Sequence, residues 1–376
     1  MTQVMNMDLN EIRAEINEVD KQLQELFTKR MELCGQVADY KIANGLPVFQ
    51  KDREKQVIAN VTEGAPEGLQ GATRVYFQTM MDISKCLQYR KMFDNTGFIP
   101  FKRLDLSGRH RVAVPGTFGS YNHIACSELF EDADTMFFDS FEEIFKAVSA
   151  GAAEFGILPI INSTAGSVVQ TYELMRQYDF KICAQAKLKI SHCLAARKGV
   201  RLEDIHDVYS HEQALRQCSD LINRGAYKAH SFSNTSLAAC YVKESSEPCA
   251  AICSEKCAEE LGLEILRRSV QNAAENYTKF ILISHETFKS DNADTISVCL
   301  ALPHQSSSLY RLLTKFSVAG LNMTMIESMP IANTDFDVMF YLDFKGDIGK
   351  KEVTTLLSEL SHELSYFKFL GNYKEV

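Results

Sequence analysis

The sequence predicts a multidomain protein with three parts: an all-helical N-terminal domain, a central α/β domain and a C-terminal βαββαβ unit. Before residue 94, apolar residues recur every three or four positions, which is the period of amphipathic helices. From residue 110 onward, short apolar runs alternate with helical stretches, as in α/β folds. A segment with Pro, Gly and basic residues separates the two patterns. We therefore expect domains at 1–94, 110–286 and 292–376, with a linker over 95–109.

The N-terminal part should form three helices, over residues 8–42, 52–64 and 72–93. Asn44 and Gly45 end the first of them. The other two helices are much shorter, so nothing within one chain covers the full length of the first. This predicts an intertwined homodimer, or a higher homo-oligomer, in which two copies share their long helices.

Two further sets of elements follow from the changes in periodicity. The expected strands of the central domain are 111–114, 154–159, a segment after residue 178, 207–210, 250–253 and 279–284. The C-terminal part is predicted as strand 296–302, helix 309–318, strands 323–329 and 337–344, helix 350–360 and a final short strand. That order is typical of a ferredoxin-like unit, which often binds a regulatory ligand.

Composition excludes several classes of protein. The 376 residues carry a net charge of −9 with dispersed Lys and Arg, so no basic face for nucleic acid is expected. There is no signal-peptide core and no apolar run long enough for a membrane span. The eleven scattered cysteines are typical of reduced thiols. We therefore expect a cytoplasmic protein without a membrane partner.

No metal or other cofactor is expected. Cys249, Cys253 and Cys257 recur every four residues, which invites a metal interpretation. The first two should lie in a strand and the third in the following helix, so we expect that one face cannot present all three. Packing of small residues is then favoured over a metal site.

A cation interrupts the apolar stripe of the first helix. Arg30 lies on the same stripe as Val19 and Val37, and Lys41 follows on it. A cation inside a helix bundle is unfavourable unless an anion meets it there. Either an acidic side chain faces Arg30, or the bundle binds an acidic small molecule.

Other polar residues accompany it. Ser84 and Gln88 lie four residues apart on one side of the third helix, Arg53 and Glu54 open the second, and Arg13 lies off the stripe of the first. Each has a bland explanation alone, such as a first-turn Glu favoured by the helix dipole. Together they describe a pocket rich in cations, without a nucleophile, a metal-binding set or an acid/base pair.

Five motifs resemble the all-helical chorismate mutases. They are Ile-Arg13-x-x-Ile-x-x-x-Asp20, Lys29-Arg30-x-x-Leu, Tyr40-Lys41, Asp52-Arg53-Glu54 and Asp82-Ile-Ser84-x-x-x-Gln88. The resemblance implies that Arg30 and Arg13, the latter from the partner subunit, share the substrate carboxylates. It implies that Lys41 and Gln88 face the ether oxygen and that Glu54 holds the ring hydroxyl. Arg53 and Ser84 would line the pocket.

One position departs from that family. Gln50 stands where relatives often have an aspartate near the ring hydroxyl. An amide still accepts a hydrogen bond, so we expect weaker substrate binding at Gln50 without loss of activity.

The central segment resembles prephenate dehydratases, which have two lobes around a cleft. The matching motifs are Pro115-Gly-Thr-Phe-Gly119-Ser120-Tyr, Leu158-Pro-Ile-Ile161-Asn162-Ser163-Thr-Ala-Gly-Ser, Tyr209-Ser210-His211-x-Gln213-Ala-Leu-x-Gln217-Cys and Asn276-Tyr-Thr278-Lys279-Phe. The resemblance implies that Thr278 assists the departing hydroxide. The substrate-binding residues it implies are Ser120, Asn162, Ser163, Ser210, Gln217 and Lys279. His192 and His211 would be structural, with a proton relay as the alternative.

Two departures bear on this second activity. Ile161 replaces the glutamate of the family's Pro-Ile-Glu-Asn, and Lys279 replaces the arginine of its Thr-Arg-Phe. Isoleucine cannot imitate a carboxylate, and lysine lacks the bidentate fork of arginine. We therefore expect dehydratase activity, and whether Ile161 and Lys279 slow it stays an open question.

The C-terminal segment resembles the ACT domain of the same enzymes. Ser307-Ser308-Leu309 is similar to their Gly-Ala-Leu motif, and Glu327-Ser328-Met329-Pro330 to their Glu-Ser-Arg-Pro motif. In relatives these segments bind phenylalanine at a subunit interface. Ser307 lacks the freedom of glycine and Met329 lacks the guanidinium, so inhibition by phenylalanine stays an open question.

The three segments occur in the order of the bifunctional chorismate mutase–prephenate dehydratases. The resemblance implies an enzyme of phenylalanine biosynthesis that converts chorismate to prephenate and then to phenylpyruvate. A second hypothesis keeps only the mutase active, with Ile161, Lys279 and Met329 marking an impaired dehydratase and ACT part. A third, from another class, is an amino-acid-sensing binding protein, which leaves the polar helix bundle unexplained.

Overall fold

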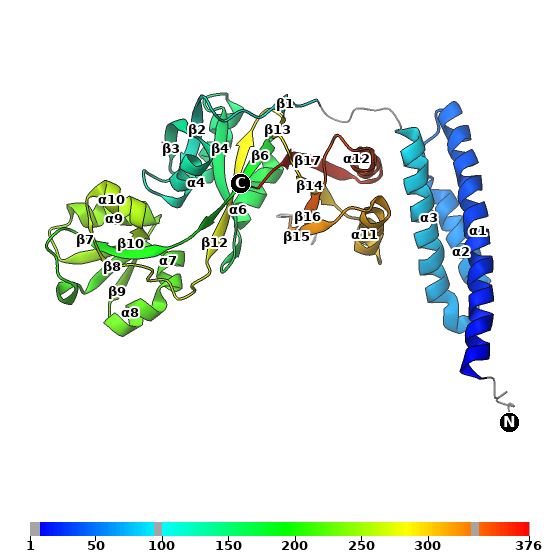
Figure 1. The fold of residues 1–376 in the computed structure, drawn as a ribbon, viewed down its shortest axis with the longest axis horizontal. Coiled ribbons are helices and arrows are strands. Elements are labelled where there is room, and N and C mark those ends of the chain that lie inside the picture. The colour runs from blue at the N-terminus through cyan, green and yellow to red at the C-terminus, as the bar shows by residue number, and fades with distance from the viewer. Residues whose placement is uncertain (1–7, 94–99, 332–337, 376) are drawn as a thin grey trace. The chain divides into compact units, whose positions relative to one another are not determined.

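The computed structural model describes residues 8–93, 100–331 and 338–375 (Figure 1). The first residues of the expected linker and residue 337 of an expected strand lie outside that range. The chain divides into two compact units. The first comprises Met1–Phe98, Leu300–Met323 and Ile348–Phe367, and the second Ile99–Cys299, Thr324–Asp347 and Lys368–Val376.

The first unit is a bundle of helices arranged on α3. Its helices are α1 (Leu9–Ala43), α2 (Lys51–Glu63), the 3-10 turn η1 (Glu67–Leu69), α3 (Gln70–Met92), α11 (Ser308–Ala319) and α12 (Lys351–Glu363). Asp8 and Glu11 form a capping box at the start of α1. Helix α3 contacts α1, α2, α11 and α12. The three N-terminal helices are confirmed within two residues, and α3 is the element that the other long helices share.

Helix α1 leaves its apolar stripe uncovered. It has 35 residues, whereas α3 has 23. The exposed apolar side chains include Ile16, Val19, Leu23, Leu26, Leu33 and Val37. A contiguous apolar stripe of this length marks an interaction surface.

The second unit contains two mixed sheets that are linked by two chain crossings. One sheet has the order β3 (Asp132–Phe138), β2 (Arg109–Pro115), β4 (Phe155–Asn162), β12 (Tyr277–Ser284) and β6 (Lys181–Lys189), with β5 (Gly166–Ser167) paired to β4. Its helices are α4 (Tyr121–Leu129), α5 (Phe141–Ser149) and α6 (Val169–Gln177).

The other sheet has the order β11 (Glu264–Arg267), β7 (His192–Ala196), β10 (Cys249–Ser254), β8 (Asp207–His211) and β9 (Lys228–Phe232). Its helical segments are η2 (Leu202–Asp204), α7 (Glu212–Gln217), α8 (Ser219–Gly225), α9 (Thr235–Glu244) and α10 (Glu255–Leu261).

The chain passes between these sheets from β6 to β7 and returns from β11 to β12 (Figure 1). The two crossing segments are joined by backbone hydrogen bonds, from Ile190 N to Asn276 O (2.7 Å) and from Val270 N to His192 O (2.9 Å). Side chains on both crossings are therefore brought close together, although they are far apart in sequence.

The C-terminal strands form a third sheet in the same unit. Its order is β1 (Lys102–Arg103), β13 (Phe288–Lys289), β17 (Tyr366–Tyr373), β14 (Thr295–Ala301), β16 (Val338–Lys345) and β15 (Met323–Pro330). The chain order β14, α11, β15, β16, α12, β17 matches the expected βαββαβ pattern. The expected linker contains one strand that was not predicted. This is β1, in which Lys102 and Arg103 pair with Phe288 and Lys289 of β13.

The strands that the sequence left out are short edge strands or runs of small residues. Strands β3, β9 and β11 lie at sheet edges and carry polar residues, so their apolar signal is weak. Strand β7 is buried throughout and shows no alternation. A buried strand of this kind resembles a piece of helix in sequence.

One expectation about the cysteines was wrong. Cys249 and Cys253 lie four residues apart on β10, and both belong to one apolar cluster with Cys257 and Cys193. Residues i and i+4 of a strand share a face, and α10 contacts β10, so one side of the sheet does carry all three. Their surroundings are apolar, and among the described residues no group of His, Cys, Asp or Glu is placed to hold a metal ion.

Gly371 on β17 tests the packing of the third sheet. A Cβ at this position would lie 2.1 Å from the carbonyl oxygen of Ile182, a backbone atom that cannot move aside cheaply. We expect Gly371→Ala to lower the free energy of unfolding by about 2 kcal/mol. Gly108→Ala is the control, because its Cβ would meet only the His110 ring at 3.6 Å. Equal urea midpoints for the two variants would contradict the packing described here.

Candidate active sites

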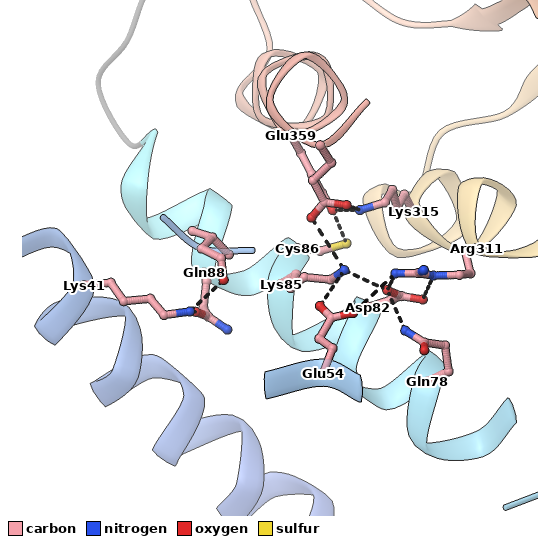
Figure 2. Close-up of polar contacts among 12 residues, drawn as sticks. Lys41, Glu54, Gln78, Asp82, Lys85, Cys86, Gln88, Arg311, Lys315 and Glu359 are labelled. Atoms are coloured by element: carbon pink, nitrogen blue, oxygen red, sulfur yellow. Dashed lines mark hydrogen bonds and ion pairs between the residues drawn. The ribbon is translucent and has the colours of Figure 1, made fainter. Parts of the chain in front are cut away.

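The helical cluster (Arg30, Lys41, Glu54, Ser84 and Gln88) lies within the first unit. Lys41 on α1 is 8% exposed and Gln88 on α3 is 7% exposed. The Lys41 ammonium donates to the carbonyl oxygen of Val48 (2.6 Å) and to Oε1 of Gln88 (3.3 Å) (Figure 2). Burial lowers the pKa of Lys41, while neighbouring anionic groups including Glu54 oppose that shift. A buried cation is therefore held beside an amide.

Arg30 and Ser84 meet at a residue that sequence reasoning missed. The Ser84 hydroxyl lies 3.3 Å from Sγ of Cys34, and Nη1 of Arg30 lies 3.9 Å from the same sulfur. Cys34 is one helical turn after Arg30 on α1. The expected arginine is therefore half-buried, and it shares Cys34 as a neighbour with the expected serine.

Glu54 is placed in the first turn of α2, with its side chain 16% exposed. Its Oε1 lies 3.0 Å from Nζ of Lys85 on α3. Lys85 is itself 3.0 Å from Oδ1 of Asp82. Asp82 was noticed only as part of a motif and Lys85 not at all, because an isolated Lys in a helix is usually a surface residue.

Three residues expected in this site lie at the surface of the described chain. Arg13, Gln50 and Arg53 are exposed. Arg53 donates to Gln56 within its own helix (3.0 Å), and Gln50 is the N-cap residue of α2. The structure thus assembles the helical cluster but leaves Arg13 on the exposed face of α1.

The crossover cluster (Asn162, Thr164, His192, Gln217, Asn276 and Thr278) lies in the second unit, where the chain crosses between sheets. Asn162 ends β4, and Thr278 lies opposite it on β12. The Asn162 amide donates to Oγ1 of Thr278 (2.8 Å) and to Oδ1 of Asn276 (2.8 Å). Asn162 and Thr278 are 5% and 7% exposed. The Thr278 hydroxyl is therefore fixed by a buried amide.

Gln217, at the end of α7, links this pair to the other sheet. Its Nε2 donates to Oγ1 of Thr164 (2.9 Å), and its Oε1 accepts from Nδ2 of Asn276 (3.2 Å). Thr164 also donates to Oδ1 of Asn162 (2.8 Å). Thr164 and Asn276 were inside quoted motifs but were given no role, and the network gives them a place beside Thr278.

His192 extends the network towards Tyr121. With its proton on Nε2, His192 donates to Oε1 of Gln217 (3.3 Å) and turns Nδ1 to the Tyr121 hydroxyl (3.2 Å). Burial lowers the pKa of His192 to about 4. The imidazole is therefore neutral at pH 7, which favours a structural role for His192 over a role as a proton donor.

The glycine-rich loop before α4 closes against the second sheet. Gly119 has φ +75°, and a Cβ there would lie 2.5 Å from Cα of Cys257, so the position needs glycine. Ser120 is the N-cap of α4 and accepts from His123 N (3.3 Å). Thr117 Oγ1 is buried and finds no hydrogen-bond partner among the described residues.

Three other expected residues lie outside the crossover cluster. Ser210 is fully buried and donates to the carbonyl oxygen of Ile252 (2.6 Å). Ser163 accepts from the backbone N–H of Tyr277 (2.9 Å). His211 caps α7 by accepting from Gln213 N (3.3 Å). Each has a clear local structural task.

Lys279 faces away from Thr278. Successive residues of a strand point to opposite faces of the sheet. The Lys279 ammonium lies 2.6 Å from Oε2 of Glu375 and 3.3 Å from Oε1 of Gln185. Ile161 is the cross-strand partner of Lys279. The two departures from the dehydratase pattern are therefore neighbours of one another.

The expected regulatory residues lie on two elements, at the start of helix α11 and on strand β15. Ser307 precedes α11 with φ +69°, a left-handed conformation that favours glycine. Ser308 donates to the carbonyl oxygen of Pro303 (2.7 Å), and Leu309 is 39% exposed. Glu327 and Ser328 lie on β15.

Two families of known proteins match successive segments of the chain. Residues 12–89 match chorismate mutase type II, and residues 112–288 match prephenate dehydratase. The bifunctional chorismate mutase/prephenate dehydratase of Enterobacter agglomerans is 30% identical, over 98% of this chain and 97% of its own length. One relative thus spans both segments.

Two solved structures share the fold of the second segment. Prephenate dehydratase from Arthrobacter aurescens, in complex with L-Phe, is 27% identical with a TM-score of 0.65, over 70% of this chain and 90% of its own. GqqA, described as a novel type of quorum quenching acylase, is also 27% identical, with a TM-score of 0.64 over 71% of this chain and 98% of its own. Among the described residues, none of the helices is long and apolar enough to cross a membrane.

The lowered pKa of His192 gives a testable pH dependence. An unfolded histidine titrates near pH 6.5, so the unfolded state binds the proton first as the pH falls. The contribution of neutral His192 to stability is complete above about pH 6.5 and declines towards pH 4. Between pH 8 and pH 5 we expect the wild type to lose about 2 kcal/mol more unfolding free energy than His192→Gln. Urea titrations of both proteins measure this, and parallel pH dependences would show that His192 is not buried as a neutral ring.

Proposed function

The chain belongs to the bifunctional chorismate mutase/prephenate dehydratase family, and we infer that it catalyses both reactions. It rearranges chorismate to prephenate and then converts prephenate to phenylpyruvate, in phenylalanine biosynthesis. The observation that carries this conclusion is the relative that matches over almost the whole of both chains. Each matched segment of the chain contains one of the two polar clusters.

The helical cluster suits the mutase reaction. Converting chorismate to prephenate is pericyclic and needs no covalent intermediate, so the site has to fold a dianion and stabilise charge on the breaking ether bond. A rate enhancement of about 10⁶ requires about 8 kcal/mol. Charge-assisted hydrogen bonds of about 1.5–3 kcal/mol each supply most of this if they strengthen in the transition state.

We propose for these side chains the roles that the resemblance to chorismate mutases implies. Arg30 binds a substrate carboxylate, and Lys41 with Gln88 donates to the ether oxygen as negative charge develops there. Lys41 and Gln88 are already hydrogen-bonded to each other at 3.3 Å, so their donors are preorganised. Glu54 accepts from the ring hydroxyl, and Ser84 lines the pocket.

The mutase site is completed by a second copy of the chain. Arg13 lies on the exposed face of α1, and the apolar stripe of that helix is uncovered within one chain. Pairing of two α1 helices buries the stripe and carries Arg13 into the neighbouring site. The functional unit is therefore a homodimer or a larger even-numbered assembly.

The crossover cluster suits the dehydratase reaction. Prephenate loses CO₂ and its ring hydroxyl, and aromatisation of the ring supplies the driving force. Thr278 donates a hydrogen bond to the departing hydroxyl, and its own hydroxyl is oriented by Asn162 at 2.8 Å. A threonine hydroxyl is a very weak acid, so Thr278 stabilises or relays and does not act as a free proton source. Gln217 and Asn162 position the substrate.

Phenylalanine is the proposed effector of the C-terminal segment. The dehydratase from Arthrobacter aurescens that shares this fold was solved with L-Phe. The residues that we propose as regulatory are Ser307, Ser308 and Leu309 at the start of α11 and, separately, Glu327 and Ser328 on β15.

Paired variants test the assignment of the two reactions to two sites. Arg30→Ala removes a carboxylate-binding cation, so we expect at least a hundredfold loss of chorismate turnover with prephenate turnover intact. Thr278→Ala should do the reverse, so that prephenate accumulates from chorismate. Product identification from each substrate, with and without phenylalanine, is the measurement. Retained chorismate turnover in Arg30→Ala, or an unchanged prephenate rate in Thr278→Ala, would refute the corresponding assignment.

A charge placed on the stripe tests the dimer. Leu23→Glu puts a carboxylate into the proposed α1 contact, so we expect the native mass to fall to that of one chain and mutase turnover to drop at least tenfold. Lys21→Glu, two residues earlier and on the opposite side of α1, is the control and should leave the mass unchanged. Light scattering after gel filtration gives the masses. A Leu23→Glu protein that keeps its mass and mutase rate would exclude this interface.

A further inference from the structure

One face of α3 buries charge against α2, α11 and α12 (Figure 2). Asp82 is fully buried and Lys85 is 3% exposed. These two residues are separated by three positions, as are Lys85 and Gln88, so Lys85 lies between Asp82 and Gln88 around the helix. The side chains of Ser84 and Gln88 meet α1. The charged face of α3 therefore adjoins the proposed mutase site, and Glu54 belongs to both.

Arg311 of α11 forms a two-pronged contact with this face. Its Nε donates to Oδ2 of Asp82 (3.0 Å), and its Nη2 donates to Oδ1 of the same carboxylate (2.9 Å). Nη2 also lies 3.6 Å from Oε2 of Glu54. A planar fork fixes the orientation of its partner, which a lysine in the same place could not do.

Lys85 is shared between the same two carboxylates. Its Nζ lies 3.0 Å from Glu54 and 3.0 Å from Asp82. Glu363 of α12 lies 3.6 Å from the same ammonium, but it is 2.9 Å from Lys315. Around Glu54 and Asp82 the charges therefore balance, with Lys85 and Arg311 as the two cations.

We propose that Arg311 and Lys85 are positioning residues of the mutase site, which hold the Glu54 carboxylate where it accepts from the ring hydroxyl of chorismate. The proposal rests on the proposed function, because that function assigns the ring hydroxyl to Glu54. On this proposal the mutase site depends on α11, a helix more than 200 residues further along the chain than Glu54.

The charge balance explains why Arg311 matters to a carboxylate that it approaches only at 3.6 Å. When Arg311 is removed, Asp82 keeps Lys85 as its only cation within 4 Å among the described residues. Lys85 and Asp82 are fixed on one helix, one turn apart, so the ammonium remains with Asp82. Glu54 is on a different helix. It then loses the positive charge of Arg311 and no longer has a cation that fixes the orientation of its carboxylate.

Steady-state kinetics of Arg311 variants test this inference on the full-length enzyme. For Arg311→Ala we expect kcat/KM for chorismate to fall about tenfold, chiefly through KM, while kcat/KM for supplied prephenate stays within about twofold. Arg311→Lys keeps the charge but loses the fork, and should fall between this variant and the wild type. Arg90→Ala is the matched control, because Arg90 also joins α3 to α11, through the carbonyl oxygen of Val318 (2.7 Å). It should leave both activities within about twofold.

A double-mutant cycle with Glu54→Gln separates positioning from a general effect on packing. If Arg311 acts through Glu54, adding Arg311→Ala to Glu54→Gln should change mutase kcat/KM by less than about twofold. Losses that multiply would overturn the inference, as would equal losses in Arg311→Ala and Arg90→Ala. If Glu54→Gln itself leaves the mutase unchanged, the role of Glu54 is wrong and the inference falls with it. A wild-type enzyme without any chorismate turnover would instead refute the proposed function.

Discussion

The buried ammonium of Lys85 is the constraint on which the first unit depends. Its side chain is 4% exposed, and carboxylates from α2, α3 and α12 lie within 3.6 Å of it. Leaving a buried charge without its partners is far more destabilising than losing an exposed ion pair. The three helices therefore have to meet at this point, and apolar contacts alone would not fix their register. The same cation also faces Glu54, so the interaction that organises the bundle also orients a residue of the proposed mutase site.

The two clusters differ in charge, and this difference suits the two reactions proposed for them. The helical cluster contains cations and amide donors. These groups suit a dianionic substrate whose ether oxygen gains negative charge as the bond breaks. The crossover cluster is built from amides, hydroxyls and a histidine that burial keeps neutral at pH 7. Such a network offers neutral hydrogen-bonding groups, which suits the leaving hydroxyl of the proposed dehydratase step. Each sheet crossing contributes one part of it, so the two-sheet architecture is what places Asn276 beside Asn162.

Local patterns in the sequence predicted the helices and most buried strands, whereas contacts between distant residues could not be predicted. The apolar stripe of α1 follows from helical periodicity and is seen in the structure, where it is exposed, and Arg30 is half-buried beside Cys34. Edge strands such as β3 lacked an apolar pattern. The role of Lys85 depends on Arg311 and Glu363, which come from another part of the chain. No spacing within α3 reveals those partners.

Ile161 and Lys279 are a second case in which a contact between distant residues could not be predicted from the sequence. As separate positions they suggest a damaged dehydratase site. In the structure they are cross-strand partners, so a change of one alters the environment of the other. Lys279 has taken Glu375, near the C-terminus, as its carboxylate, and the pair lies on the sheet face opposite Thr278. The groups that hold the Thr278 hydroxyl lie on the unaltered face, so the two substitutions do not by themselves argue against dehydratase activity.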